Sequence, residues 1–329
     1  MANEFHNKHL FQIDNEAEFL ANALDTFRLQ YDQNKVYQTF CKHLKVTPKQ
    51  VQQLKDIPFL PIHFFKEKHL LSTTDAPAAI FTSSGTTGST TSKHLVTDIS
   101  LYEESYLTAF EQFYAEPSSF CILALLPSYL EREGSSLIYM VNDLINKSGH
   151  LKSGFFLDDF NRLKEHLIAL ESAGTKTLLI GVSFALLDFC EHYPIQLKNT
   201  IVMETGGMKG RRKELIREEL HELLKKGFGV DQIHSEYGMT ELLSQAYSKG
   251  NGVFNCPAWM KVLVRDTEDP LTYLTNGKSG GINVVDLANR NSCSFIATQD
   301  LGKKYDDDSF EILGRFDDSD IRGCNLMVL

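Results

Sequence analysis

A segment rich in glycine and small hydroxyl residues, FTSSGTTGSTTSKHLV, occupies positions 81–96 between two apolar ends. Gly85 and Gly88 allow the backbone to approach a ligand closely, and the peptide N–H groups between them can form a nest for phosphate oxygens. Four hydroxyl side chains add donors: Ser83, Ser84, Thr86 and Thr87. The segment is not a Walker A loop, because no Lys-Ser/Thr pair follows Gly88, nor a Gly-x-Gly-x-x-Gly loop. It indicates either a phosphate-binding loop or a solvated Ser/Thr/Gly turn.

A second candidate is SEYGMTE at 235–241, which follows a predicted strand. The Thr240 hydroxyl could contact a phosphate, and the Glu241 carboxylate could bind Mg²⁺, a hard cation that prefers oxygen ligands. The alternative interpretation is a helix N-terminus, with Thr240 as the cap and Glu241 complementing the helix dipole.

Two further polar positions follow predicted strands near the C-terminus. Asp300, in ATQDLG, could accept hydrogen bonds from both hydroxyls of a ribose, or it could simply belong to an Asp-x-Gly turn. Arg315 opens the charged stretch GRFDDSDIRG, which otherwise reads as a solvated turn. Each signal is weak alone, whereas the four motifs in this order along one chain favour a nucleotide site.

The elements that must position these residues alternate between strands and helices from residue 81 to about 208. Three short apolar runs bounded by turn signals predict strands: FCILALLP at 120–127, TLLIGVS at 177–183 and NTIVMETGG at 199–207. Helical stretches between them predict a mainly parallel sheet covered on both faces. The first 70 residues show helical spacing, and strands with little helix follow residue 250, which predicts an antiparallel addition to the α/β core.

Composition excludes several classes of function. The chain has 329 residues, a formal net charge of -10 and no long basic run, which argues against nucleic-acid binding. No apolar run approaches the roughly 20 residues of a membrane span, and the N-terminus lacks the apolar core of a signal peptide. The six cysteines are far apart without a Cys-x-x-Cys pair, which favours reduced thiols and a cytoplasmic location.

Taken together, the motifs resemble those of the adenylate-forming (ANL) superfamily of acyl-CoA synthetases and related ligases. SSGTTG is similar to the phosphate loop of that superfamily, YGMTE to its Tyr-Gly-x-Thr-Glu motif, DLG to its ribose-binding motif and GRFDD to its hinge motif. IPFLPIHFFK, PSYLEREGSSLIYM and METGGMKGRRKEL resemble, more narrowly, the LuxE-type acyl-protein synthetases. Those enzymes activate a fatty acid as acyl-AMP and load it onto their own cysteine.

The resemblance implies an α/β fold of the ANL-type adenylation N-terminal domain, lacking the usual C-terminal lobe. We expect mainly parallel sheets covered by helices, plus a smaller β subdomain. The expected regions are a helical N-terminal region at 1–70, the α/β adenylation core at 71–250, a β-rich subdomain of the same domain at 251–313, and the hinge motif with a short C-terminal tail at 314–329.

Residue by residue, the resemblance implies a site for ATP and Mg²⁺. The implied contacts of the phosphates and the base are the loop from Ser84 to Gly88, Gly206 and Gly207 along the adenine and acyl pocket, and Tyr237 near the adenine. The remaining implied contacts are Thr240 at the α-phosphate, Glu241 at Mg²⁺, and Asp300 and Arg315 at the ribose.

Two positions depart from the pattern or extend it. Lys93 follows Gly88 by five residues without a preceding proline, unlike the Gly-x-Pro-Lys of the superfamily. Without the lysine of a C-terminal lobe, transition-state charge would be met by loop donors, Mg²⁺, and Lys93 or Arg315.

Cys324, in the tail RGCNLMVL, stands where LuxE-type enzymes carry the acyl-accepting cysteine, and Arg322 would favour its thiolate. The alternative is a small apolar residue that closes a C-terminal strand.

The expected function is therefore ATP-dependent activation of a carboxylic acid, of the fatty-acid class, to acyl-AMP. Transfer to Cys324 would follow, and then transfer to a partner such as a reductase or an acyl carrier protein. One alternative is a ligase that passes the acyl group directly to coenzyme A or to a carrier protein. Another is a non-catalytic nucleotide-binding scaffold, which pyrophosphate release with a suitable acid would exclude.

Overall fold

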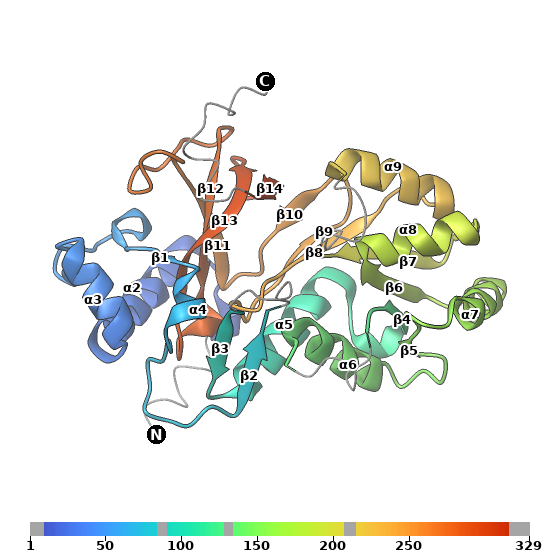
Figure 1. Cartoon of the computed structure of the whole chain (residues 1–329), viewed down its shortest axis with the longest axis horizontal. Coiled ribbons are helices and arrows are strands. Elements are labelled where there is room, and N and C mark those ends of the chain that lie inside the picture. The colour runs from blue at the N-terminus through green and yellow to red at the C-terminus, as the bar shows by residue number, and fades with distance from the viewer. Residues whose placement is uncertain (1–9, 84–90, 128–133, 207–214, 316–329) are drawn as a thin grey trace. The chain divides into compact units, whose positions relative to one another are not determined.

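The computed structural model describes residues 10–83, 91–127, 134–206 and 215–315 (Figure 1). The chain forms two compact units, of which the first comprises residues 1–105, 240–244 and 255–329 and the second comprises residues 106–239 and 245–254. In the described part of the chain, no helix combines the length and the apolar character needed to cross a membrane. The mixed α/β architecture predicted from the sequence is confirmed.

The N-terminal part of the first unit is helical. After a short 3-10 turn (Leu10–Gln12), α2 (Glu16–Gln33) and α3 (Lys35–His43) follow each other directly. Asn15 and Asn34 cap the two helices, because their side-chain oxygens accept the backbone N–H groups of Glu18 and Tyr37, each at 3.0 Å. The helix is confirmed, and its buried face carries Phe19, Ala23, Thr26, Phe27 and Gln30.

A small hairpin and a short helix follow in the same unit. β1 (Leu60–Pro61) and α4 (Phe64–Glu67) come after a 3-10 turn at Leu54–Asp56. β2 (Ala79–Thr82) and β3 (Lys93–Val96) pair antiparallel on either side of the segment 84–90. α5 (Ile99–Tyr114) begins in this unit and continues into the second.

The sheet of the first unit is mostly antiparallel. β11 (Met260–Arg265), β12 (Ser279–Asp286), β13 (Phe295–Lys304) and β14 (Phe310–Arg315) follow one another in spatial order, and β1 joins β13 as a parallel partner. A 3-10 turn, Leu287–Asn289, follows β12. This arrangement agrees with the β-rich character predicted beyond residue 250.

The second unit contains the parallel sheet. Its order is β5 (Gly154–Phe155), β4 (Cys121–Leu125), β6 (Thr177–Val182), β7 (Thr200–Thr205) and β8 (His234–Tyr237), with β9 (Ala246–Ser248) antiparallel to β8 and β10 (Val253–Asn255) next to β9. Every residue of β4 and β6 is buried, which explains why both strands read as uninterrupted apolar runs.

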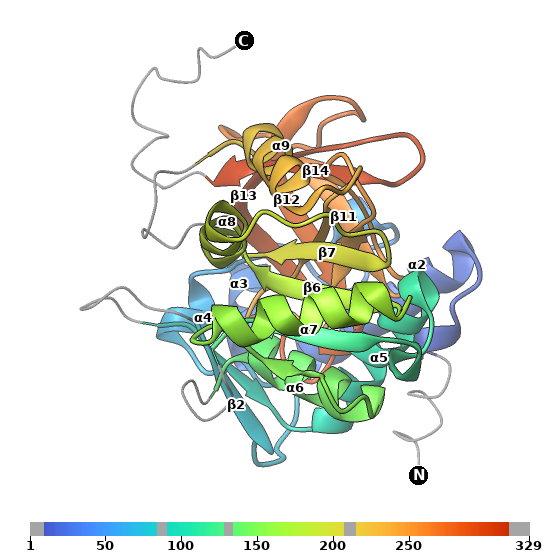
Figure 2. The same ribbon diagram turned by 90° about the vertical axis from the view of Figure 1, so that its right-hand side faces the viewer.

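Helices cover both faces of this sheet. They are α6 (Ser136–Ser148), α7 (Phe160–Ser172), α8 (Ser183–His192) and α9 (Arg217–Phe228), with a 3-10 turn at Pro117–Ser119. Figures 1 and 2 show β6 and β7 with α8 and α9 on one side and α6 on the other. α6 and α9 end at Gly149 and Gly229, whose φ angles of 62° and 63° are in the left-handed region that glycine adopts without strain.

The Tyr37 hydroxyl is a buried polar group whose removal should destabilise the first unit. Tyr37 is completely buried, and its hydroxyl donates to the Pro58 carbonyl oxygen at 2.7 Å. We expect Tyr37→Phe to lower the free energy of unfolding by about 1 to 2 kcal/mol, because the carbonyl would lose that donor in the interior. Urea unfolding would measure the loss, with Tyr31→Phe, at a half-buried position of α2, as the control. Equal midpoints for the two variants would contradict the prediction.

Candidate active site

The Thr240–Glu241 pair lies in the first unit, where two buried polar side chains fix its backbone. Nδ1 of His94, on β3, lies 2.8 Å from the Thr240 carbonyl oxygen. The Asn289 side-chain nitrogen donates to the Glu241 carbonyl oxygen at 2.7 Å. His94 and Asn289 are both fully buried, so the pair is anchored to the interior of the unit.

Asp286, the last residue of β12, anchors the same segment further along the chain. Its Oδ2 accepts the backbone N–H groups of Leu243 at 2.7 Å and Ser244 at 3.1 Å, and its Oδ1 accepts the Ser244 hydroxyl at 2.6 Å. Trp259 also donates to the Ser244 hydroxyl, at 3.0 Å. Burial raises the pKa of Asp286, while these donors act in the opposite direction. Because both carboxylate oxygens are engaged, Asp286 positions the segment and is not available to a ligand.

The side chain of Glu241 is a buried carboxyl group with cations nearby. Glu241 is 7% exposed, and burial raises its pKa above the usual range. The Ser92 hydroxyl, the Arg315 guanidinium and the Lys66 ammonium act in the opposite direction and lower that pKa. Lys66, on α4, was not assigned a role from the sequence. Lys66 is the last residue of IPFLPIHFFK, a stretch that resembles the LuxE-type proteins, and this position is the feature of the sequence that could have indicated a role for it.

Asp300 and Arg315, the two predicted ribose contacts, are neighbours in the structure. They face each other on β13 and β14, and Nε of Arg315 donates to a carboxylate oxygen of Asp300 at 3.0 Å. The Asp300 side chain is 6% exposed, whereas that of Arg315 is 68% exposed. The pair therefore combines an anchored carboxylate with a guanidinium that solvent or a ligand can reach.

A buried arginine supports the strand that carries Asp300. The Arg265 guanidinium donates to the carbonyl oxygens of Ile282 at 2.7 Å and Thr298 at 2.6 Å, and to Oδ1 of Asn283 at 2.7 Å. Burial lowers the pKa of Arg265 to about 10, so the group stays charged at neutral pH, and Asp300 acts in the opposite direction. Gly281 leaves room for it, since a Cβ there would lie 2.6 Å from Cζ of Arg265.

The ends of the phosphate-loop candidate are described, and its centre is not. Ser83 and Ser92 are joined twice, because Ser83 N–H donates to the Ser92 carbonyl at 3.2 Å and Ser92 N–H donates to the Ser83 hydroxyl at 2.9 Å. Lys93 begins β3 opposite Thr82, and its side chain is exposed. The predicted site residues Ser84, Gly85, Thr86, Thr87, Gly88, Gly207 and Cys324 lie outside the described residues.

Two predicted residues of the second unit lie at the carboxyl ends of neighbouring parallel strands. β7 ends at Thr205, opposite Glu236 of β8, so Gly206 and Tyr237 follow at the same edge of the sheet. Gly206 has a φ of 62°, and its carbonyl accepts the Ser183 hydroxyl at 3.1 Å. Tyr237 is 8% exposed and packs against Phe254 with ring centroids 5.9 Å apart. This edge is where parallel α/β sheets usually bind ligands.

A charged cluster that the sequence did not predict supports that edge. Glu204, on β7, pairs with the Arg217 guanidinium at 2.6 Å and lies 3.7 Å from His221 Nε2, and its other oxygen accepts the Ser183 hydroxyl at 3.2 Å. Burial by itself raises the pKa of Glu204, but His221 and Arg217 together hold it below the usual value. Arg217 and His221 come from α9, so the cluster ties this helix to β7.

Glu236 should make the stability of the protein depend on pH near neutrality. Burial raises the pKa of Glu236 to about 7, and the charge of Glu204 adds to this, while the Thr205 hydroxyl lowers it. A carboxyl group with a raised pKa stabilises the fold below its ordinary pKa, and this contribution is lost as the pH rises through 7. We expect Glu236→Gln to be more stable than wild type at pH 8 by about 2 kcal/mol, with a flatter pH profile between 5 and 8.

Glu171, in the same unit, is a control because its pKa is shifted downward, whereas the pKa of Glu236 is shifted upward. The pKa of Glu171 is lowered by the Thr200 hydroxyl and by the backbone N–H groups of Lys198 and Asn199, which outweigh the effect of burial. Glu171→Gln should therefore be less stable than wild type at neutral pH, with the difference shrinking in acid. Thermal melting at several pH values measures both variants, and parallel pH profiles for wild type and Glu236→Gln would refute the assignment.

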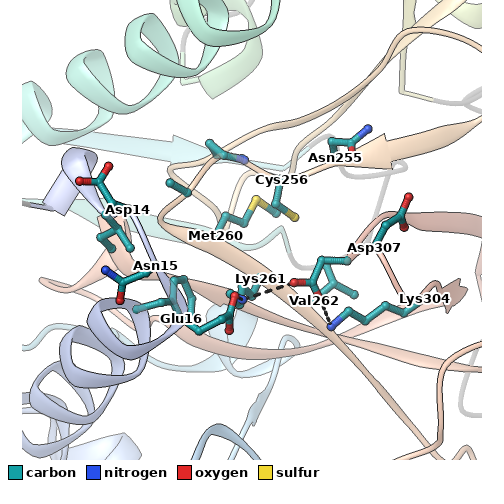
Figure 3. A pocket seen from close by; sticks show the side chains of 15 residues that line it. Asp14, Asn15, Glu16, Asn255, Cys256, Met260, Lys261, Val262, Lys304 and Asp307 are labelled. Atoms are coloured by element: carbon teal, nitrogen blue, oxygen red, sulfur yellow. Dashed lines mark hydrogen bonds and ion pairs between the residues drawn. The ribbon is translucent and has the colours of Figure 1, made fainter.

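A surface pocket of about 260 Å³ in the first unit is separate from these residues (Figure 3). Lys261 and Lys304 line it and both pair with Asp308, at 3.5 Å and 2.6 Å. Cys256 also lines the pocket, and burial raises the pKa of its thiol to about 12, so it stays protonated at neutral pH. Of the described residues that line the pocket, none belongs to the four motifs, and its lysines are already paired.

Solved structures with a similar fold identify the type of fold. ATP-bound MatB from Rhodopseudomonas palustris is 20% identical in sequence, with a TM-score of 0.53 over 74% of this chain and 49% of MatB. A 2-hydroxyisobutyryl-CoA ligase in complex with 2-HIB-AMP and CoA is 12% identical, with a TM-score of 0.66 over 93% of this chain and 70% of the ligase. The fold is therefore that of the ANL adenylate-forming enzymes, as predicted. The chain spans about half the length of MatB.

The narrower resemblance to LuxE-type proteins is also confirmed. Residues 9–109 match the family described as "Acyl-protein synthetase, LuxE". Over 324 residues the chain is 24% identical to the long-chain-fatty-acid--luciferin-component ligase of Vibrio harveyi, which covers 91% of this chain and 84% of that protein. The similarity to that ligase extends well beyond the segment matched by the family.

Proposed function

We propose that this protein is an enzyme that activates a carboxylic acid, of the fatty-acid class, with ATP and transfers the acyl group to a thiol. The observation that carries the proposal is that the first unit contains Glu241, Asp300 and Arg315 together, with Glu241 within electrostatic reach of Arg315 and Arg315 bonded to Asp300. The similarity to a long-chain fatty-acid ligase and to ATP-bound MatB supports the acid substrate and the nucleotide.

The proposed first step is adenylate formation. A carboxylate oxygen of the acid attacks the α-phosphorus of ATP, the bond from that phosphorus to the bridging oxygen breaks, and pyrophosphate leaves. Asp300 would accept hydrogen bonds from the ribose hydroxyls, while Arg315 holds the Asp300 carboxylate in place. Thr240 would contact the α-phosphate. Arg315 and Lys66 would offset the negative charge that collects there, since fixed charges act most strongly on a developing charge.

The donor set fits Mg²⁺ as the accompanying cation. In the described residues no group of three or more His, Cys, Asp or Glu side chains forms a metal cluster. Mg²⁺ needs no such cluster, because it is commonly held by one or two carboxylates together with substrate phosphates. Glu241 would supply the carboxylate, and the cation would neutralise phosphate charge when bound. A carboxylate whose pKa is raised by burial gains from a cationic neighbour, which is consistent with this role.

The proposed second step moves the acyl group to sulfur. A thiolate attacks the acyl carbon, a C–S bond forms, the C–O bond to the phosphate breaks, and AMP leaves. We propose Cys324 as the nucleophile, followed by transfer to a reductase or carrier protein, because the sequence around it resembles the LuxE tail. An external thiol is the alternative, and it is supported by the similarity to a ligase whose structure contains CoA.

Acid-dependent ATP–pyrophosphate exchange tests the first step. The purified protein would be incubated with Mg·ATP, labelled pyrophosphate and a series of saturated carboxylic acids of increasing chain length. Exchange that requires an acid supports the proposal and identifies the preferred chain. Absence of exchange with every acid would overturn it and leave a nucleotide-binding scaffold. Consumption of CoA thiols with acid-dependent exchange would instead favour the external acceptor.

A further inference from the structure

His94 occupies a position between the phosphate-loop hairpin and the Thr240–Glu241 pair. It lies on β3, which starts just after the segment 84–90, and it is completely buried. Nδ1 lies 2.8 Å from the Thr240 carbonyl oxygen, and Nε2 lies 2.9 Å from Oδ1 of Asn289. The ring edge of Phe65 packs against the imidazole, with centroids 5.5 Å apart. A polar ring is thus held in an apolar interior by two contacts to oxygen.

The two neighbours of the ring are both hydrogen-bond acceptors. The Thr240 atom is a backbone carbonyl, and the amide orientation of Asn289 is set because its nitrogen donates to the Glu241 carbonyl at 2.7 Å. An imidazole with one proton can satisfy only one of two facing oxygens. Burial lowers the pKa of His94 to about 4, so the ring carries one proton at neutral pH. The location of that proton decides which contact is a hydrogen bond.

The remaining contacts of the segment favour the proton on Nδ1. The Glu241 carbonyl is already held by Asn289, and the Glu241 carboxyl is held by Ser92. Beyond Glu241, the N–H groups of Leu243 and Ser244 are held by Asp286. Among the described residues, the contact made to the Thr240 carbonyl is the one from His94. A proton on Nδ1 satisfies that buried carbonyl, whereas Asn289 stays bonded through its nitrogen in either case.

We propose that His94 is a positioning residue, whose Nδ1–H holds the Thr240 carbonyl and thereby fixes Thr240 and Glu241 relative to the strand that leaves the phosphate loop. The inference rests on the proposed function, because Thr240 and Glu241 act on phosphate and cation in that reaction. The imidazole ring itself does not contact the substrate in this proposal. A displacement of Thr240 by even about 1 Å is enough to slow such a reaction about a hundredfold.

Two amide replacements separate the two ring nitrogens. In His94→Asn the side-chain nitrogen falls near the place of Nδ1 and can still donate to Thr240, whereas in His94→Gln it falls near the place of Nε2. We expect His94→Asn to keep kcat for acid-dependent exchange within about threefold of wild type. His94→Gln should lower kcat roughly 10- to 100-fold and leave KM for the acid within about twofold. Equal losses in the two variants, or no loss in either, would overturn the proposal.

Hydrogen exchange gives a readout that does not need activity. A peptide covering residues 239–244 contains the N–H groups that Asp286 holds, so its exchange rate reports how firmly the segment is anchored. His94→Gln should speed exchange there at least about tenfold, and His94→Asn should match wild type. If His94→Gln does not fold, faster exchange in His94→Asn alone would refute the proposal. A wild-type protein without acid-dependent exchange would refute the proposed function, whereas this measurement would still decide the role of His94.

Discussion

Replacement of Cys324 by serine is expected to abolish an ATP-dependent acyl adduct on the protein while acid-dependent ATP–pyrophosphate exchange continues within about twofold of the wild-type rate. The reason is chemical, because a thiolate is the attacking species and a serine hydroxyl is far less acidic and far less nucleophilic at neutral pH. Adenylate formation does not consume the thiol, so the first step should persist. Intact-protein mass spectrometry after incubation with Mg·ATP and the preferred acid measures the adduct, and neutral hydroxylamine should remove it.

Cys256→Ser provides the matched control for this experiment. Cys256 is a half-buried cysteine beside the surface pocket, and burial raises the pKa of its thiol to about 12. A thiol that stays protonated is a poor nucleophile, so Cys256→Ser should acquire the adduct as wild type does. An adduct that survives in Cys324→Ser and disappears in Cys256→Ser would move the acceptor to Cys256. Pyrophosphate release without an adduct on wild type would favour the external thiol.

The resemblance to the ANL motifs implied that Asp300 and Arg315 both contact the ribose, and the strand pattern around them explains why the two residues are neighbours. Two strand-like runs are separated by a turn rich in aspartate, and the motif residues stand at the ends of these runs. Neighbouring strands with a short connection usually pair antiparallel. That pairing places Asp300 opposite Arg315, and the side chains then meet at 3.0 Å. The contact between the two side chains thus follows from local strand pairing, whereas their role at a ribose stays a prediction.

The residues that hold the Thr240–Glu241 pair could not be predicted in the same way. His94 and Asn289 contact Thr240 and Glu241 across large separations in sequence, and nothing in their local sequence distinguishes them from ordinary strand and turn residues. Asp286 follows an apolar strand and reads as the start of a turn, yet it is completely buried. Long-range polar contacts depend on which surfaces the fold brings together, which periodicity does not encode.

The charged helix α9 shows a second limit. Its sequence, rich in glutamate and lysine, predicts a solvated face, and most of that face is exposed in the structure. Arg217 and His221 nevertheless turn to the buried Glu204. The spacing of the two residues by four positions places them on one face of the helix. A buried acidic partner on a neighbouring strand is what selects that face, and sequence alone does not reveal it.

Replacement of Glu241 by glutamine is expected to lower the rate of acid-dependent adenylate formation by about 100- to 1,000-fold without destabilising the protein. The carboxylate is 7% exposed and its pKa is raised by burial. Such a group stabilises the fold below its ordinary pKa, and this contribution is lost as the pH rises through the raised value. At neutral pH the neutral amide should therefore be tolerated as well as the carboxylate, and it can keep a contact with Ser92. The loss of activity would come from the missing charge.

A titration with Mg²⁺ separates the cation role from a general loss of activity. If Glu241 helps to hold Mg²⁺, the concentration for half-maximal exchange should rise at least about tenfold in Glu241→Gln. Glu104→Gln is the control, since the pKa of Glu104 is also raised by burial and Glu104 belongs to none of the motifs. It should keep full activity and the wild-type dependence on Mg²⁺. An unchanged half-maximal concentration in Glu241→Gln, with a large fall in rate, would assign Glu241 a role other than metal binding, because a residue that acts on the phosphates directly would alter the rate at every concentration of the cation.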